Sequence, residues 1–164
     1  MSHPRRTMAA LLFSVCLLLP AVAQAFTFNV SGFGARLGIT NPEDLDTAIL
    51  VGVHAEMMEQ GSSFRLLPGL IYWNGEGDSN GFGGNFDLAY DLGGRGSSMP
   101  YVGAGVALSH TDLGEDASTD LGANLFGGLR IAGPGATYFV EGRYVAAQVS
   151  QVQLAAGATF GIGR

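Results

Sequence analysis

Apolar and polar residues alternate with a period of two along most of this chain, in runs of strand length. The clearest run covers residues 82–92, where apolar side chains have one parity and mostly polar ones the other. The two sets are Phe82, Phe86, Leu88, Tyr90 and Leu92, and Asn85, Asp87, Ala89 and Asp91. Because successive side chains of a strand point to opposite faces, this run predicts a strand with an apolar face and a polar face.

Counting such runs gives eight predicted strands. They cover residues 27–40, 46–59, 63–74, 81–92, 100–110, 120–132, 136–147 and 149–163. A tilted strand needs about 9 to 11 residues to cross a membrane, and single-chain bacterial barrels have an even number of strands. The pattern therefore predicts an all-β chain that forms an eight-stranded antiparallel up-and-down transmembrane β-barrel.

Residues 1–25 have the features of a secretory signal peptide. A basic pair at 5–6 precedes an apolar stretch over 9–19, and the small-x-small triplet at 23–25 is a cleavage site. The apolar stretch is shorter than the roughly 20 residues of a membrane-spanning helix. We therefore expect a cleaved signal peptide, a barrel domain over 26–164 and a location in the bacterial outer membrane.

The predicted connections differ in character at the two ends of the barrel. Connections one, three and five carry most of the 14 acidic residues, whereas two, four and six are short and rich in glycine. The seventh connection is a bare hairpin near 147–148. With the N-terminus in the periplasm, the acidic connections face outward, where their main role is solvation and an alternative role is to share divalent cations with lipopolysaccharide. The acidic residues are Glu43, Asp44, Asp46, Glu76, Asp78, Asp112, Glu115, Asp116 and Asp120.

Charged residues inside the predicted strands share the polar parity, with four of each sign. They are Arg36, Arg65, Arg130 and Arg143, and Glu56, Asp87, Asp91 and Glu141. The interior of an eight-stranded barrel is filled by side chains, and buried charges require partners, so equal numbers predict a neutral, paired lumen. His54 is assigned to the same network. A tight hairpin at 60–61 predicts that Glu56 lies opposite Arg65, within salt-bridge reach.

Two irregularities and one aromatic pattern add detail. The parity changes near Ser31-Gly32, which predicts a glycine bulge, and Pro68 lies in the middle of a strand, which predicts a second bulge. Aromatic residues near the strand ends predict two interfacial girdles. These are Tyr72, Trp73 and Phe82 at the outer end, and Tyr90, Tyr138 and Phe160 at the inner end.

Four stretches, 100–108, 125–130, 139–144 and 152–162, resemble the C-terminal half of the small eight-stranded outer-membrane β-barrel proteins, similar in build to the OmpA-type transmembrane domain. The last strand resembles the assembly signal of that family, in which Gly157 is followed at +3 and +5 by Phe160 and Ile162. The resemblance implies assembly by the outer-membrane insertion machinery and contact with outer-membrane lipid and lipopolysaccharide. We expect a monomer without a cofactor.

No group of residues predicts catalysis or metal binding. His54-x-Glu56 has no third ligand at a defined spacing, and the only cysteine, Cys16, lies in the predicted signal peptide. A barrel-type lipid A deacylase is expected to show a His-x-Ser pair on its lipid-facing side, where this chain has His110-x-Asp112. Ser109 points to the opposite face. The net charge of −6 leaves no basic surface for nucleic acid.

Three classes of function follow. The first, which the paired lumen favours, is an outer-membrane barrel with no continuous pore and a structural or surface-interaction role. The second is a secreted or periplasmic lipocalin-like carrier of a small apolar ligand, in which the apolar face points inward. The third is a barrel enzyme acting on lipid A or other envelope lipids. The discriminating feature is which face carries the charges.

Overall fold

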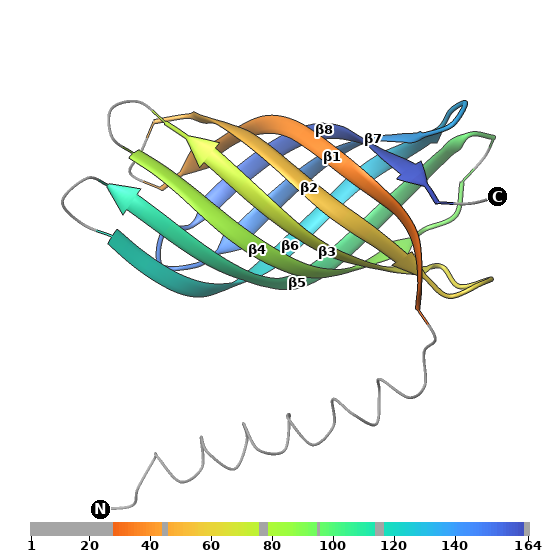
Figure 1. Ribbon diagram of the computed structural model, residues 1–164, viewed down its shortest axis with the longest axis horizontal. Helices are drawn as coiled ribbons and strands as arrows, with labels where there is room; N and C mark the ends of the chain where they lie inside the picture. Colours follow the sequence, from red (N-terminus) through yellow and green to blue (C-terminus); the bar gives the residue numbers. More distant parts are fainter. Residues whose placement is uncertain (1–27, 44–45, 76–78, 95, 114–116, 163–164) are drawn as a thin grey trace, which may run out of the picture.

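The chain forms a closed antiparallel barrel of eight strands (Figure 1). The computed structural model describes residues 28–43, 46–75, 79–94, 96–113 and 117–162. The strands are β1 (Asn29–Pro42), β2 (Ala48–Met58), β3 (Phe64–Asn74), β4 (Ser79–Asp91), β5 (Ser98–Leu113), β6 (Ala117–Ala132), β7 (Thr137–Ala146) and β8 (Gln151–Gly161). Each strand pairs with its sequence neighbour, and β8 closes the barrel on β1. The predicted eight-stranded up-and-down barrel is confirmed, whereas the predicted signal peptide lies outside the described residues.

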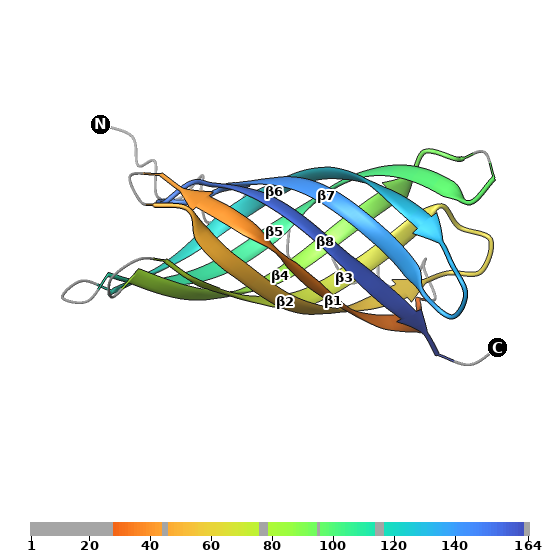
Figure 2. The ribbon, with the colours of Figure 1, turned by 90° about the horizontal axis from the view of Figure 1, so that it is seen from above.

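The strands are inclined to the barrel axis, and the two ends of the barrel differ (Figures 1 and 2). One end, called the turn end here, carries the β2–β3, β4–β5 and β6–β7 connections together with the last described residues of the chain. Its turns contain all of the described glycines with positive φ: Gly61, Gly93, Gly96 and Gly135. Glycine adopts this backbone conformation without a steric penalty, which allows such short reversals. The opposite end is called the loop end.

Side chains divide by parity between the outside and the inside of the barrel. In β4, Phe86 and Leu88 are 54% and 44% exposed, while Asp87 between them is 0% exposed. All eight strands contribute large exposed hydrophobic side chains to the outer face. In the part of the chain that the structure describes, no helix is long and apolar enough to cross a membrane. The predicted apolar-out, polar-in alternation of the strands is confirmed.

The predicted bulge in the first strand is present. The pairing of β1 with β2 shifts between Val30, which pairs with Met57, and Gly32, which pairs with Glu56. A Cβ atom on Gly32 would lie 2.6 Å from the carbonyl oxygen of Phe160. Glycine is therefore required where the bulged strand approaches β8.

The predicted bulge at Pro68 is wrong. The register between β2 and β3 is the same on both sides of the proline, from His54↔Gly69 to Met57↔Leu66, so no residue is inserted. Instead the pairing with β2 is interrupted opposite Pro68, while its pairing with Phe86 on β4 is kept. Proline has no amide hydrogen to donate, and the ladder opens locally instead of shifting.

The β5 and β6 strands extend further toward the loop end than the alternation predicted. Asp112 pairs with Ala117, and Ser109 pairs with Asp120. Asp112 was expected in the connecting loop and lies in β5 instead, whereas Asp120, counted among the loop acids at the first residue of the predicted strand 120–132, lies within β6. The reason is that the cross-strand ladder continues through the polar residues of this ribbon, which the hydrophobic pattern does not mark.

The predicted place of Trp73 in an outer aromatic girdle is also wrong. Trp73 is 2% exposed and packs inside the barrel with Ala48, Leu50 and Ile71. Tyr72 is 45% exposed and faces outward, as expected. Adjacent residues of a strand point to opposite faces, so both cannot belong to the same girdle.

Candidate functional site

The interior of the barrel is the candidate functional site, because it holds the charged side chains of the strands. The eight predicted lumen charges all lie inside, and seven of them are buried, with Asp91 partly exposed. They form two groups of four, each with two arginines and two carboxylates. The net charge of each group is therefore zero.

The first group, called the turn-end ring, is a closed cycle of alternating charge. Arg65 contacts Glu56 at 3.1 Å and Asp91 at 2.8 Å. Arg130 contacts the same two carboxylates at 3.1 Å and 3.2 Å. Each charge thus has two partners of opposite sign, which offsets the cost of removing it from water. The four side chains come from β2, β3, β4 and β6, so the ring ties strands across the lumen.

The predicted contact between Glu56 and Arg65 forms, but not in the predicted register. Arg65 pairs with Met58, and the β2–β3 connection is longer than the expected two-residue turn at 60–61. Glu56 therefore lies diagonally across from Arg65, not directly opposite it. The length of an arginine side chain spans this offset.

The second group, called the mid-barrel chain, runs linearly from Arg36 to Asp87. Arg36 contacts Glu141 at 3.1 Å, Glu141 contacts Arg143 at 3.0 Å, and Arg143 contacts Asp87 at 2.6 Å. The guanidinium of Arg143 also lies 4.5 Å from the ring centre of Phe126. The pair of Arg143 and Asp87 is the most deeply buried of these ion pairs, because both side chains are 1% exposed.

Tyr101 connects the two groups and was not predicted. Its hydroxyl donates to Glu141 Oε2 at 2.9 Å, and its ring lies 5.0 Å from the guanidinium carbon of Arg65. The alternation of the sequence indicated that Tyr101 points inward, because the neighbouring Val102 points outward. The contacts themselves required the closed barrel.

Asn124 is a second lumen residue that sequence reasoning missed. Its amide donates to Asp87 Oδ1 at 2.8 Å and to Asn85 Oδ1 at 3.4 Å. The amide thus supplies a neutral donor to the carboxylate that Arg143 already contacts. Its position between the outward residues Ala123 and Leu125 was the available signal.

His54 lies inside the barrel but contacts a hydroxyl instead of a carboxylate. Its Nε2 is 2.9 Å from Thr159 Oγ1, and its ring meets that of Phe139 edge-on at 5.6 Å. Its Nδ1 has no hydrogen-bond partner among the described residues. The structure thus places His54 beside the charged groups, without an ion pair to the eight described lumen charges.

The loop end of the lumen is filled mostly without charges. Trp73, Leu50 and Ile71 pack across it, and the nearby Gln151 accepts from Thr40 and from Gln153. A Cβ on Gly81 would lie 2.6 Å from the Trp73 ring, so glycine provides the space for the indole. The interior is therefore occupied at the loop end, at mid-barrel and at the turn end.

The acidic rim is described only in part. Glu43 and Asp46 are exposed in the β1–β2 connection, and Asp112 and Asp120 are partly buried on β5 and β6. The predicted loop acids Asp44, Glu76, Asp78, Glu115 and Asp116 lie outside the described residues. Among the residues that are described, no group of three or more His, Cys, Asp or Glu side chains is placed to hold a metal ion.

The region around His110 bears on the enzyme alternative. His110 Nδ1 lies 2.8 Å from Thr119 Oγ1, and its ring is 5.0 Å from that of Phe82. Ser109, adjacent in sequence, has the opposite parity and points to the other face of the sheet. The geometry thus brings His110 to a threonine, not to the neighbouring serine.

The three residues of the family-like assembly signal lie near the end of β8. Phe160 and Ile162 are 58% and 50% exposed on the outer face. Gly157 faces inward, where a Cβ would lie 2.5 Å from the Phe139 ring. Glycine at 157 therefore has a packing reason of its own.

We expect Tyr101→Phe to lower the free energy of unfolding of the refolded barrel by about 1.5 to 3 kcal/mol, the range for hydrogen bonds to charged groups. The substitution removes the hydroxyl that donates to Glu141 Oε2, while Glu141 Oε1 keeps its contacts with Arg36 and Arg143. Urea titration followed by gel mobility measures the change. Tyr90→Phe, at a 42% exposed tyrosine, is the matched control and is expected to change stability by less than about 0.5 kcal/mol. An equal effect of the two substitutions would contradict the role of Tyr101.

Comparisons with known proteins identify the fold. No family model matches the chain, and no curated protein matches it either. Solved structures do match, at low identity. Neisserial surface protein A matches with a TM-score of 0.64 and 17% identity, covering 80% of this chain and 95% of that one. The N-terminal β-barrel domain of Pseudomonas aeruginosa OprF matches with a TM-score of 0.61 and 17% identity, covering 83% and 100%.

The outer membrane enzyme PagL also matches, with a TM-score of 0.52 and 18% identity, covering 80% of this chain and all of that one. At these identities the likeness concerns the fold alone. The chain therefore has the fold of the small eight-stranded outer-membrane barrels, in agreement with the family resemblance of its sequence.

Proposed function

We propose that this chain is an integral barrel protein of the bacterial outer membrane, a monomer with a structural or surface-interaction role. The observation that carries the proposal is the division of side chains between the two faces. Soluble monomers rarely expose apolar patches larger than a few hundred Å², yet all eight strands here carry large exposed hydrophobic side chains. A lipocalin-like carrier needs the reverse arrangement, with its apolar face inside.

The lumen supports a barrel without a continuous pore. The cavity between the turn-end ring and the mid-barrel chain has a volume of about 10 Å³, enough for one water molecule at most. Salt bridges of the turn-end ring lie on one side of this cavity and those of the mid-barrel chain on the other, and Trp73 fills the loop end. The charged groups act as a plug that holds opposite walls together.

The ends of the barrel support an orientation and a set of contacts. We place the turn end in the periplasm and the loop end outside, with Glu43 and Asp46 among the acids that face the surface. There they contact outer-membrane lipid and lipopolysaccharide, through shared divalent cations or solvent. The outward position of Phe160 and Ile162 makes the last strand accessible to the outer-membrane insertion machinery.

The proposal includes no catalytic step. PagL, which shares the fold, is an outer membrane enzyme. Few residues of this chain bear on such an activity. His110 contacts Thr119, and the His-x-Ser pair expected of a barrel-type deacylase is absent from the sequence. The enzyme alternative has no further observation in its favour.

An arginine on the outer face tests the proposal. Leu37 is 61% exposed in the middle of β1, and Leu37→Arg is expected to destabilise the barrel in phospholipid vesicles by about 2 to 4 kcal/mol, the cost of arginine at the bilayer midplane. Asn41→Arg, on the same strand and face but near the loop end, is the control, with an expected cost of about 0 to 1 kcal/mol. Urea titration of the vesicle-bound protein measures both.

Fractionation of cells that express the full chain completes this test. The unaltered protein is expected in the outer-membrane fraction, as a band whose mobility on an SDS gel changes on boiling. Recovery in the soluble periplasmic fraction, together with equal stability of the two arginine variants, would overturn the proposed membrane location.

A further inference from the structure

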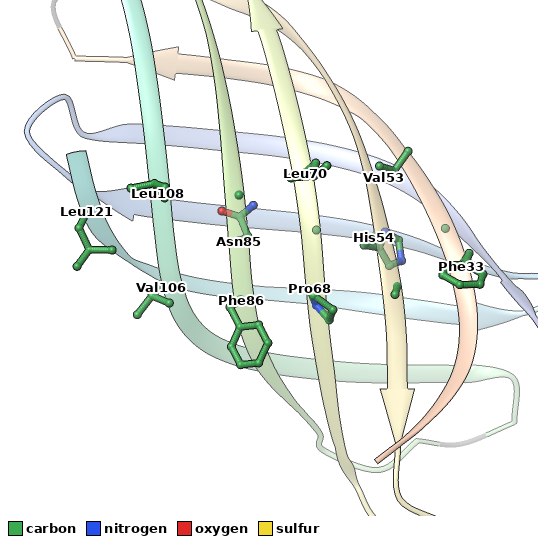
Figure 3. A pocket seen from close by; sticks show the side chains of 14 residues that line it. Phe33, Val53, His54, Pro68, Leu70, Asn85, Phe86, Val106, Leu108 and Leu121 are labelled. Carbon is green, nitrogen blue, oxygen red and sulfur yellow. The ribbon is translucent and has the colours of Figure 1, made fainter. Parts of the chain in front are cut away.

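The outer face of the barrel carries an apolar groove that the lumen does not explain. It has a volume of about 710 Å³ and extends over β1 to β6. Figure 3 shows Phe33 on β1 at one border of the groove, with Pro68 and Leu70 on β3 between it and Phe86 on β4. On the β5 and β6 side, it ends at Leu108 and Leu121.

The register explains why the barrel wall is hollowed here. Phe33 pairs with Ala55 on β2, and Phe86 pairs with Pro68 on β3, so two small side chains lie between two phenylalanines. This is also where Pro68 interrupts the β2–β3 ladder. In a neighbouring cross-strand row, Gly84 on β4 pairs with Leu70 on one side and Leu108 on the other, so a residue without a side chain lies between two leucines. A row of large, small, small, large residues thus produces a depression across the strands.

Gly84 leaves space that a side chain would otherwise fill. The nearest atom to a Cβ built on Gly84 is Leu70 Cδ2, at 3.8 Å, which is an ordinary van der Waals contact. Gly34 and Gly69, which also line the groove, differ because a Cβ on either would meet His54. The absence of a side chain at 84 is therefore not required by the packing of the barrel.

The lining favours hydrocarbon over water or a polar group. The polar residues at the groove are His54 and Asn85, and both are engaged on the inner side, with Thr159 and Asn124 respectively. Apolar cavities without polar partners remain dry and bind apolar molecules. The groove is also continuous with the exposed apolar belt of β1 to β6, which is the surface that faces lipid under the proposed function.

We propose that this groove holds one acyl chain of a bilayer phospholipid, laid across the Ala55–Pro68 depression between Phe33 and Phe86. This inference rests on the proposed membrane location. The chain fills the depression and makes dispersion contacts that a flat barrel wall would not provide. The site is one of lipid binding on the outer wall, separate from the charged lumen.

Lipid retention by single-site variants tests the proposal. The unaltered barrel, Gly84→Leu and Gly142→Leu are each assembled in nanodiscs of dimyristoylphosphatidylcholine, and native mass spectrometry counts the phospholipid molecules that remain bound after release. Leucine at 84 extends into the groove. Gly142 is the matched control, because it is an outward strand glycine on β7 with no described atom within 4 Å of a built Cβ.

We expect one phospholipid to remain on the unaltered barrel and on Gly142→Leu, and retention to fall by about tenfold or more in Gly84→Leu. All three variants are expected to keep the heat-dependent gel shift of a folded barrel. Equal retention by the two leucine variants, no retained lipid on the unaltered barrel, or release as a dimer whose formation Gly84→Leu abolishes would overturn the proposal. Failure of the unaltered barrel to enter the nanodisc would instead count against the membrane location itself.

Discussion

Arg143→Met is expected to lower the free energy of unfolding of the barrel by about 3 to 5 kcal/mol, the cost of breaking a buried ion pair by removing one partner. Arg143 contacts Asp87 and Glu141, and its side chain is 1% exposed. Its loss leaves two buried carboxylates with Arg36 as the remaining cation of the mid-barrel chain. Urea titration of the refolded protein in phospholipid vesicles, followed by the gel shift, measures the change.

The double variant Arg143→Met with Asp87→Asn is the control for this interpretation. It removes one charge of each sign, leaves the contact between Arg36 and Glu141, and keeps a polar side chain next to Asn124. We expect it to be more stable than Arg143→Met alone, because contacting residues are energetically coupled. A loss below about 1 kcal/mol in the single variant, or no recovery in the double variant, would show that the charges are not coupled as the structure places them.

Trp73→Ala is expected to destabilise the barrel by about 3 to 5 kcal/mol, as large aromatic truncations in cores do. The indole is 2% exposed, packs against Leu50 and Ile71, and lies over Gly81. Its removal leaves a cavity at the loop end that short neighbours cannot fill. The gel shift in urea is the appropriate measurement, because Trp73 is the only tryptophan and its fluorescence is lost.

Trp73→Phe is the matched control and is expected to recover part of the loss, because a phenyl ring occupies much of the same space. Vesicles that contain Trp73→Ala are expected to stay impermeable to small ions, since the turn-end ring and the mid-barrel chain still block the lumen. A stability change below about 1 kcal/mol would contradict the packing role of the indole. Leakage through the variant would show that Trp73, and not the charged groups, closes the barrel.

Much of the candidate site was predictable from parity. An alternation with a period of two fixes the face of the sheet on which each side chain lies. The four arginines and four carboxylates could therefore be assigned to the interior before their partners were known. The equal numbers of each sign then followed from the cost of burying unpaired charge. The same rule applied with more care would have placed Trp73 inside, since Tyr72 beside it is outside.

Two other errors arose where the geometry departs from simple periodicity. At Pro68 either a bulge or an interrupted ladder can accommodate a proline, which has no amide hydrogen to donate, and the structure has the interrupted ladder. At Asp112 the ladder of β5 and β6 continues through polar residues, which the hydrophobic pattern does not mark. In each case backbone hydrogen bonding between strands decided the outcome.

The sequence by itself determined the number of strands, their antiparallel order and the division of side chains between lumen and exterior, because these depend on local alternation and on short connections. Apart from the contact between Glu56 and Arg65 on neighbouring strands, the tertiary structure alone decided the partners within the lumen. Arg36 and Glu141 are separated by 105 residues and lie on strands that are not neighbours, as do Tyr101 and Glu141, 40 residues apart. Such contacts exist only after the sheet closes on itself, since closure sets which inward side chains meet across the barrel.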